Sequence, residues 1–305
     1  MTAMESSLEA AKEIRKSVYR TAHFAGGGHL GASFSMADII SVLYFGGVLR
    51  YDAGKPDWEE RDKLILSKGH ACYALYAALA RAGYFPEEEL LHVGKPGSRF
   101  GGHPKRGDIP GVEASTGALG HGLSFAIGIA YADKADYCEN GKEAFQRFPG
   151  KNARDAVDER NAEVPHTYVI LGDGECQEGS VWEGALSAPN LKLGNLTAIV
   201  DHNKLQGMDR LENIVGMRPF AKKWEAFGWN VLEINGHDHP EIREALLERK
   251  KDMPTLIVAN TVKGKGVSFM ENVPIWHYRM PDEDELPVLM KELGLSADDF
   301  GENKS

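Results

Sequence analysis

The sequence is poor in cysteine and in basic residues. Only three cysteines, Cys72, Cys138 and Cys176, occur among 305 residues. Three cysteines in a chain of this length do not form a disulfide framework, so we expect a reducing compartment, the cytoplasm. Lys and Arg number 35 against 45 Asp and Glu, and the formal net charge is −10. This acidic balance argues against binding to nucleic acid, which normally requires a basic face.

Long apolar runs and secretion signals are also missing. No stretch reaches the roughly 20 apolar residues that span a bilayer, and the first residues show no signal-peptide pattern, so we expect no membrane association. No GxGxxG motif follows a predicted strand, which disfavours a nicotinamide dehydrogenase. Hydrophobic residues nevertheless make up 42% of the chain, enough for a substantial core.

Apolar segments of strand length alternate with segments of helical periodicity. Five of them are predicted strands: Asp62–Leu66, Tyr168–Leu171, Leu196–Val200, Asn230–Ile234 and Thr255–Ala259. With five or six strands, this alternation predicts an α/β fold, a doubly wound parallel sheet with helices on both faces. We expect one domain over residues 1–305, with a polar insertion at about 139–165, a short helix at 152–161 within it, and a short C-terminal tail.

The N-terminal and C-terminal segments give more local predictions. Glu5 to His23 has the apolar spacing of an amphipathic helix, and Glu283–Leu293 is a second predicted helix. The glycine-bounded stretch His29–Ser33 is predicted to be a loop, with Ser35 capping the next helix and Asp38 at the capping-box position.

The stretch from His166 to Gln206 predicts one strand–turn–helix–strand unit. Its first strand stops at Gly172-Asp173-Gly174, and its second strand ends at Asp201-His202-Asn203. Because parallel strands deliver their carboxyl ends to one edge of the sheet, we expect Asp173 and Asn203 to lie side by side there. A helix beginning after Gly174 would offer free N–H groups to an anion.

The residue types at this edge indicate a metal and a diphosphate. A carboxylate and an amide oxygen are hard ligands that suit Mg²⁺, with Ca²⁺ or Mn²⁺ as alternatives. Mg²⁺ usually takes one or two protein oxygens and completes its shell with phosphate and water. Cys176 lies in the same segment, but no histidine is fixed near it, and we interpret it as a small buried residue rather than a nucleophile.

Four histidines lie at predicted loop ends: His29, His70, His103 and His277. Taken singly, each is more often structural than catalytic. Each follows a predicted strand or precedes a predicted helix, however, so all four can converge on the edge that carries Asp173. Imidazoles suit hydrogen bonds to sugar hydroxyls and proton transfer near pH 7.

GDG followed about 30 residues later by Asn resembles the thiamine diphosphate motif, and further motifs resemble transketolases. These are GGHLGAS, LSKGHA, GGHP, STGALGHG, GDGECQEG and the late WH, in family order over roughly residues 20–280. The resemblance implies that Asp173, Asn203 and the carbonyl of Leu205 hold the metal. It implies that the four histidines line the thiazolium and donor channel, and that the cofactor contacts His70, Gly117, Leu119, Gly120, Asp173, Gly174, Glu178 and Asn203. Glu178 matches the family's glutamate at the subunit interface. His202 and His121 depart from the family pattern.

A complete transketolase is about twice as long, and its second domain supplies the glutamate that activates the cofactor. The chain therefore resembles the N-terminal subunit of a split transketolase. We expect thiamine diphosphate and Mg²⁺ as cofactors, sugar phosphates as substrates, and a C-terminal-type partner subunit in a heterotetramer with two of each. The chain alone is expected to be inactive. The alternatives are a subunit similar to deoxyxylulose-phosphate synthase, the alpha chain of a 2-oxo acid dehydrogenase, and a non-catalytic cofactor-binding subunit.

Overall fold

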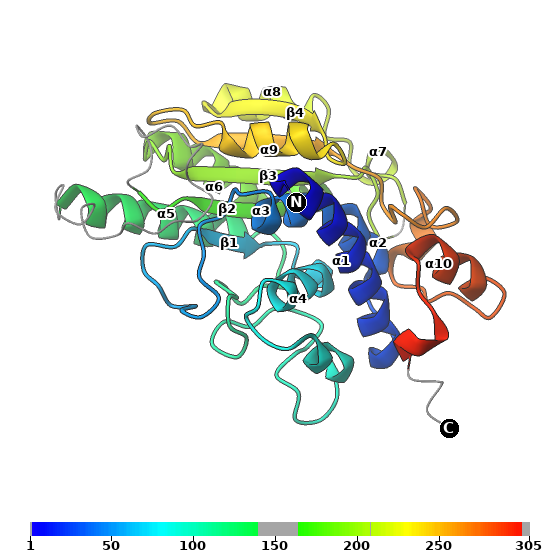
Figure 1. Ribbon diagram of the computed structural model, residues 1–305. Coiled ribbons are helices and arrows are strands. Elements are labelled where there is room, and N and C mark those ends of the chain that lie inside the picture. Colours follow the sequence, from blue (N-terminus) through cyan, green and yellow to red (C-terminus); the bar gives the residue numbers. More distant parts are fainter. Residues whose placement is uncertain (1, 140–163, 208, 301–305) are drawn as a thin grey trace.

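The computed structural model describes residues 2–139, 164–207 and 209–300. Its centre is a sheet of five parallel strands in the order β1-β2-β3-β5-β4 (Figure 1). The strands are β1 (Lys63–Leu66), β2 (Thr167–Gly172), β3 (Leu196–His202), β4 (Asn230–Asn235) and β5 (Thr255–Asn260). Each predicted strand is present, and the ends differ by no more than two residues.

Side chains alternate between two apolar layers along each inner strand. On β2, Tyr168 and Ile170 belong to one buried cluster, and Val169 and Leu171 belong to the other. Both faces of the strand are therefore covered, which explains why the sequence shows unbroken apolar runs at the strands rather than an apolar–polar alternation.

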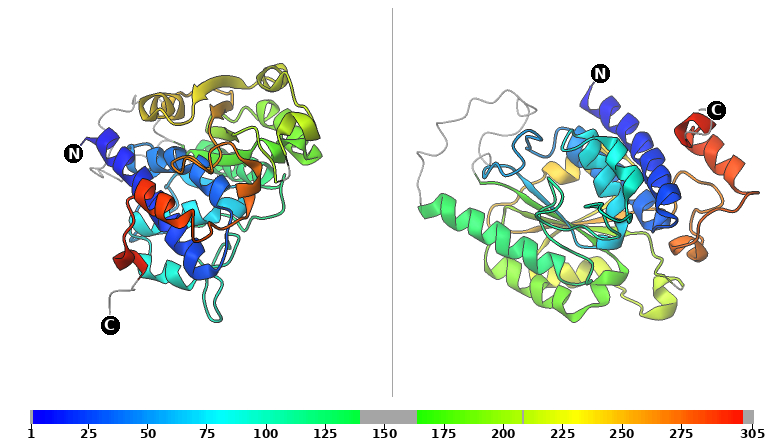
Figure 2. Two further views of the ribbon diagram at one scale, coloured as in Figure 1. Left: turned by 90° about the vertical axis from the view of Figure 1, so that its right-hand side faces the viewer. Right: turned by 90° about the horizontal axis from the view of Figure 1, so that it is seen from below.

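Helices cover both faces of the sheet (Figure 2). One layer contains α1 (Ala3–Ala25), α3 (Ala37–Phe45), α4 (Cys72–Arg81) and α9 (His239–Leu247). The other contains α5 (Gly122–Glu139), α6 (Gly179–Asn190) and α8 (Phe220–Phe227). Shorter helices are α2 (Leu30–Ser35), α7 (Leu211–Ile214) and α10 (Leu286–Leu293). The predicted α/β fold with helices on both faces of a parallel sheet is confirmed.

Short 3-10 helices connect several of these elements. They are η1 (Gly69–Ala71), η2 (Glu87–His92), η5 (Gly174–Gln177), η6 (Pro274–His277) and η7 (Ala297–Phe300). Two of them, η1 and η6, contain predicted site histidines. No helix in the described part of the chain is long and apolar enough to cross a membrane.

Two local predictions near the N-terminus were wrong. The stretch predicted as a loop continues into α2, which begins directly after His29. Ser35 is the last residue of that helix and does not cap α3, whose N-cap is Met36 with no side-chain cap bond. Ser35 and Asp38 instead bond to buried partners in other elements. The helix predicted at 152–161 lies outside the described residues.

Candidate functional site

Asp173 and Asn203 follow the carboxyl ends of two paired strands. In the register of β2 and β3, Gly172 lies opposite Asp201, so the next residues of both strands emerge at one edge. Asp173 is 2% exposed; its Oδ1 accepts from Gly174 N at 2.7 Å and its Oδ2 from Lys204 N at 2.6 Å. The carboxylate is therefore bonded to the turn that Asn203 begins, as the strand pairing predicts.

The backbone after Asp173 differs from the predicted helix start. Residues Gly174–Gln177 form the short 3-10 helix η5, and α6 begins only at Gly179. A Cβ on Gly174 would lie 2.9 Å from Gln206 Cγ, which shows how closely this turn packs on the chain after β3. The α6 N-terminus is thus displaced along the sequence from the glycine that was expected to open it.

Asp201 orients the amide of Asn203. Asn203 Nδ2 donates to Asp201 Oδ2 at 3.2 Å, while Asn203 Oδ1 accepts from Leu205 N at 3.1 Å. The Asp201 carboxylate is fully buried and accepts from four side chains: Lys68, Ser35, Thr261 and Asn203. Burial alone would raise the pKa of Asp201, but the Lys68 ammonium and the hydroxyl donors hold it below its usual range. Sequence analysis missed this role, although a carboxylate two residues before the predicted ligand was a visible signal.

Lys263 places a buried cation at the same edge. Its Nζ donates to the carbonyl of Gln206 at 2.9 Å and lies 3.4 Å from the carbonyl of Leu205. No carboxylate of the described residues lies within ion-pair distance of Lys263, and burial, followed by the nearby Lys68, lowers its pKa to about 8. An ammonium without an anionic partner is suited to a diphosphate. Sequence analysis did not single out this lysine, whose signal was its position shortly after a strand end.

Three of the predicted histidines meet. The ring centroids of His29 and His70 are 5.1 Å apart, those of His29 and His277 5.0 Å, and those of His70 and His277 5.7 Å. His277 Nδ1 lies 3.0 Å from the Nζ of Lys263, so this nitrogen accepts and its proton sits on Nε2. The histidines come from chain segments far apart in sequence, and only the fold brings them together.

Burial keeps these three imidazoles neutral. It is the largest cause that lowers the pKa of His29 to about 4, of His277 to about 4 and of His70 to about 2. After burial, the largest cause is the nearby Lys68 ammonium for His70 and the Lys263 ammonium for His277, and both also lower the pKa. Near pH 7 the three rings can therefore donate one hydrogen bond, accept another and take up a proton during a reaction.

The fourth histidine lies at a glycine turn beside this cluster. His103 is exposed, and a Cβ on Gly117 would lie 2.8 Å from its Cδ2. Gly120 has a φ of +85°, and a Cβ there would lie 2.7 Å from Glu178 Cβ. The side chains of Leu119 and Glu178 are exposed. They are open to a ligand or a second chain.

Glu175 joins three of the segments that form the edge. Its Oε1 accepts from Ser67 Oγ and, at 2.9 Å, from Gly120 N, while Oε2 accepts from Gly172 N at 3.0 Å. It thereby ties the end of β1, the turn before α5 and the end of β2. Sequence analysis missed Glu175. The adjacent Cys176 is fully buried, and burial raises the pKa of its thiol, consistent with the structural interpretation.

The oxygens at this edge fit Mg²⁺. The described residues contain no group of three or more His, Cys, Asp and Glu side chains that could hold a metal ion. A metal here would depend on one carboxylate, Asp173, with the amide oxygen of Asn203 and the carbonyl of Leu205, and would complete its shell with phosphate and water. His202 Nδ1 lies 3.4 Å from Asp173 Oδ2, and its ring stacks on Phe220.

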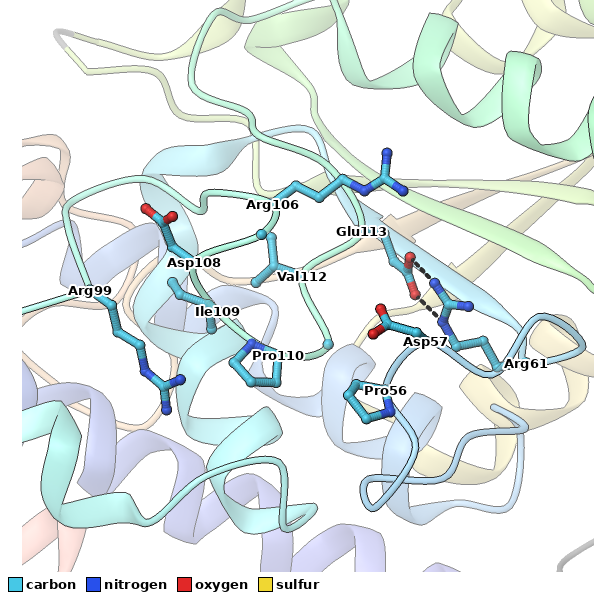
Figure 3. A pocket seen from close by; sticks show the side chains of 12 residues that line it. Pro56, Asp57, Arg61, Arg99, Arg106, Asp108, Ile109, Pro110, Val112 and Glu113 are labelled. Carbon is cyan, nitrogen blue, oxygen red and sulfur yellow. Dashed lines mark hydrogen bonds and ion pairs between the residues drawn. The ribbon is translucent and has the colours of Figure 1, made fainter.

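The loop between His103 and Gly117 forms part of the wall of a separate cavity of about 340 Å³. Figure 3 shows the paired Arg61 and Glu113 side chains at its edge, with nitrogen–oxygen distances of 2.8 and 2.7 Å. At the end of the loop, Thr116 Oγ1 donates to the carbonyl of Leu66 at 2.7 Å. These contacts fix the C-terminal end of the loop, next to Gly117, to β1 and the residues just before it.

A strand edge with one metal-suited carboxylate, a buried ammonium that has no carboxylate partner among the described residues, and a cluster of neutral imidazoles is typical of a domain that binds a diphosphate cofactor. The family model described as "Transketolase, thiamine diphosphate binding domain" matches residues 6–301. The chain therefore belongs to the transketolase family and provides its thiamine diphosphate-binding part.

Relatives of similar length are single subunits of two-subunit enzymes. An apulose-4-phosphate transketolase subunit of Actinobacillus succinogenes is 40% identical over 93% of this chain and 94% of its own. The 6-deoxy-6-sulfo-D-fructose transketolase subunit SqwG of Clostridium sp. is 37% identical over the same shares. The chain is thus one subunit of a two-subunit transketolase, a transferase subunit in thiamine diphosphate-dependent ketol transfer.

In longer relatives, the region that matches this chain is only one part of the protein. It aligns with the transketolase of Leishmania mexicana at a TM-score of 0.85 and 30% identity, covering 95% of this chain and 42% of that one. The shorter relatives are named as subunits, which indicates that a partner subunit exists.

Proposed function

We propose that this chain holds the diphosphate and Mg²⁺ of thiamine diphosphate and completes a transketolase active site with a separate C-terminal-type subunit. The observation that carries the proposal is the meeting of Asp173, Lys263 and the three neutral histidines at one strand edge. The bound cofactor supplies the carbanion chemistry that two-carbon ketol transfer requires.

The residues of this chain divide the remaining work. Asp173, Asn203 and the Leu205 carbonyl would coordinate the metal, and Gly174 and Lys263 would receive the diphosphate. His29, His70, His103 and His277 would bind donor hydroxyls and exchange protons with the substrate oxygens. Gly117, Leu119 and Gly120 would contact the cofactor. All of these residues except the exposed His103 and Leu119 are buried or half-buried.

The substrates are proposed to be a ketose phosphate donor and an aldose phosphate acceptor. The two named relatives act on ketoses that end in different groups, a phosphate in one and a sulfonate in the other. Since both relatives match this chain over almost its whole length despite this difference, we propose that the partner subunit recognises the tail. This chain would handle the carbonyl end that the donors share.

We propose a heterotetramer with two copies of each subunit, in which Glu178 lies at the interface that links paired active sites. Apolar side chains on α5 support such assembly, since Phe125 is 43% and Tyr131 51% exposed. The cytoplasm is the proposed compartment, supported by the free, buried thiols of Cys72 and Cys176.

Reconstitution tests the proposal. The purified chain, thiamine diphosphate, Mg²⁺, a ketose phosphate and an aldose phosphate should give no ketol transfer until a C-terminal-type transketolase subunit is added. Robust turnover without that partner would falsify the split-site proposal. Turnover only with pyruvate as the donor would indicate chemistry similar to deoxyxylulose-phosphate synthase, and no turnover with any partner would indicate a non-catalytic subunit.

A further inference from the structure

The loop 261–266, which carries Lys263, is held on both sides of that lysine by side chains from other elements. The backbone N–H of Val262 donates to His237 Nε2 at 2.8 Å. The carbonyl of Lys265 accepts from Arg15 Nε at 3.0 Å. The position of the Lys263 side chain therefore depends on two residues that lie outside the strand edge described above.

Arg15 and His237 both contact Asp38. This buried residue of α3 also contacts His239 at the start of α9. Asp38 Oδ2 lies 2.6 Å from Arg15 Nη2 and 2.6 Å from His237 Nδ1. Its Oδ1 accepts from Arg15 Nη1 at 3.1 Å and lies 3.1 Å from His239 Nε2. Burial alone would raise the pKa of Asp38, but the two imidazoles and the Arg15 guanidinium hold it well below its usual range.

The hydrogen bonds determine the tautomer of His237. An amide N–H is always a donor, so Nε2 must accept from Val262 and carries no proton. The ring proton therefore sits on Nδ1 and points at Asp38 Oδ2. Asp38 thus fixes the tautomer that the bond to Val262 requires, as carboxylates do for histidines in metal sites.

We propose that His237, whose tautomer Asp38 fixes, is a positioning residue that holds loop 261–266 so that Lys263 faces the diphosphate of the cofactor. The inference deepens the proposed function and rests on it. The Asp38, His237 and Val262 groups touch no predicted ligand themselves, and they act only through the lysine next to Val262.

Two conservative substitutions separate the contacts of His237. In His237→Gln the carbonyl oxygen can take the place of Nε2 and accept from Val262, while the bond to Asp38 is lost. In His237→Asn the amide can take the place of Nδ1 and keep the bond to Asp38, while Val262 N–H loses its acceptor. A purely structural role for the Asp38 network predicts damage in the Gln variant, and the positioning role predicts damage in the Asn variant.

The full-length chain is titrated with thiamine diphosphate and Mg²⁺ by calorimetry, and exchange of the Val262 amide is followed by hydrogen-exchange NMR. We expect His237→Asn to weaken cofactor binding about three- to tenfold, the effect of one hydrogen bond, and to accelerate exchange at Val262. His237→Gln should stay within about twofold of wild type. Equal affinity and equal exchange in His237→Asn and wild type, or a loss confined to His237→Gln, would overturn the proposal.

A control and a double variant complete the test. His239→Asn can keep the bond to Ser7 but loses the one to Asp38, without touching the loop, and it should leave affinity unchanged. If His237 acts through Lys263, His237→Asn combined with Lys263→Gln should bind no more weakly than Lys263→Gln alone. Additive losses would contradict the positioning role. Failure of the wild-type chain to bind the cofactor would instead contradict the proposed function.

Discussion

The histidines of this protein differ in behaviour because the fold buries them to different extents. His29, His70 and His277 form a half-buried cluster beside two lysines, and their pKa values are lowered accordingly. His103 remains exposed at the edge of the same cluster. Residue type alone could not reveal this difference, since all four stand next to glycine or at a loop end in the sequence.

The lowered pKa of His29 predicts a pH dependence of stability. The pKa of His29 is about 4 in the folded chain and lies below the ordinary 6.5. Between these two pH values the unfolded chain therefore binds more protons than the folded chain. Stability should therefore fall from pH 6.5 towards pH 4. His29→Gln should make the melting temperature less dependent on pH in that range, whereas the exposed His92→Gln should not. Identical slopes for His29→Gln and wild type would refute the prediction.

Asp173 and His103 are predicted to fail in different ways. Asp173→Ala removes the one carboxylate of the proposed metal site and should abolish Mg²⁺-dependent binding of the cofactor, measured by calorimetry. His103→Ala should lower turnover of the reconstituted enzyme by about 10²- to 10⁴-fold, as expected for loss of a proton-transfer group, with little effect on cofactor affinity. Equal loss of cofactor binding in both variants would contradict this division of roles.

At the scale of elements, strands were predicted more accurately than the turns between them. Apolar runs such as Tyr168–Leu171 were identified because a strand buried on both faces needs them. Helix starts were less predictable. The polar residues Ser35 and Asp38, interpreted as local caps, instead serve partners in other elements, and such long-range hydrogen bonds leave no periodic signal in the sequence.

Glu175 should connect the stability of these elements to cofactor binding. Glu175→Gln replaces one acceptor oxygen by an NH₂ group that faces existing donors, so at least one buried donor loses its partner. We expect the free energy of unfolding to fall by about 1–3 kcal/mol, measured by urea denaturation, with weaker cofactor binding. Glu183→Gln on the exposed side of α6 is the matched control. An unchanged unfolding midpoint in Glu175→Gln would argue against the linking role.

At the scale of the whole molecule, the proposed function gives the chain half of a cofactor site. The groups that suit a diphosphate are in place, while the part that would hold the aminopyrimidine is expected from the partner. Inorganic diphosphate with Mg²⁺ should therefore raise the melting temperature of the isolated chain nearly as much as thiamine diphosphate with Mg²⁺ at equal concentration. EDTA should remove both effects. If thiamine diphosphate with Mg²⁺ stabilises the chain and inorganic diphosphate with Mg²⁺ does not, this chain also binds the thiamine part of the cofactor.

The sequence by itself determined the strand segments, the α/β class and the juxtaposition of Asp173 with Asn203. Apolar runs are local signals, and a strand–turn–helix–strand unit brings the ends of its two parallel strands to the same edge of the sheet. It also identified the four histidines as a set. Only the tertiary structure decided which of them touch, that burial keeps three of them neutral, and that Lys263, Asp201 and Glu175 lie at the same strand edge. Those properties depend on side-chain contacts between segments far apart in the chain, where desolvation and charge act over a few ångströms and no sequence pattern records the distance.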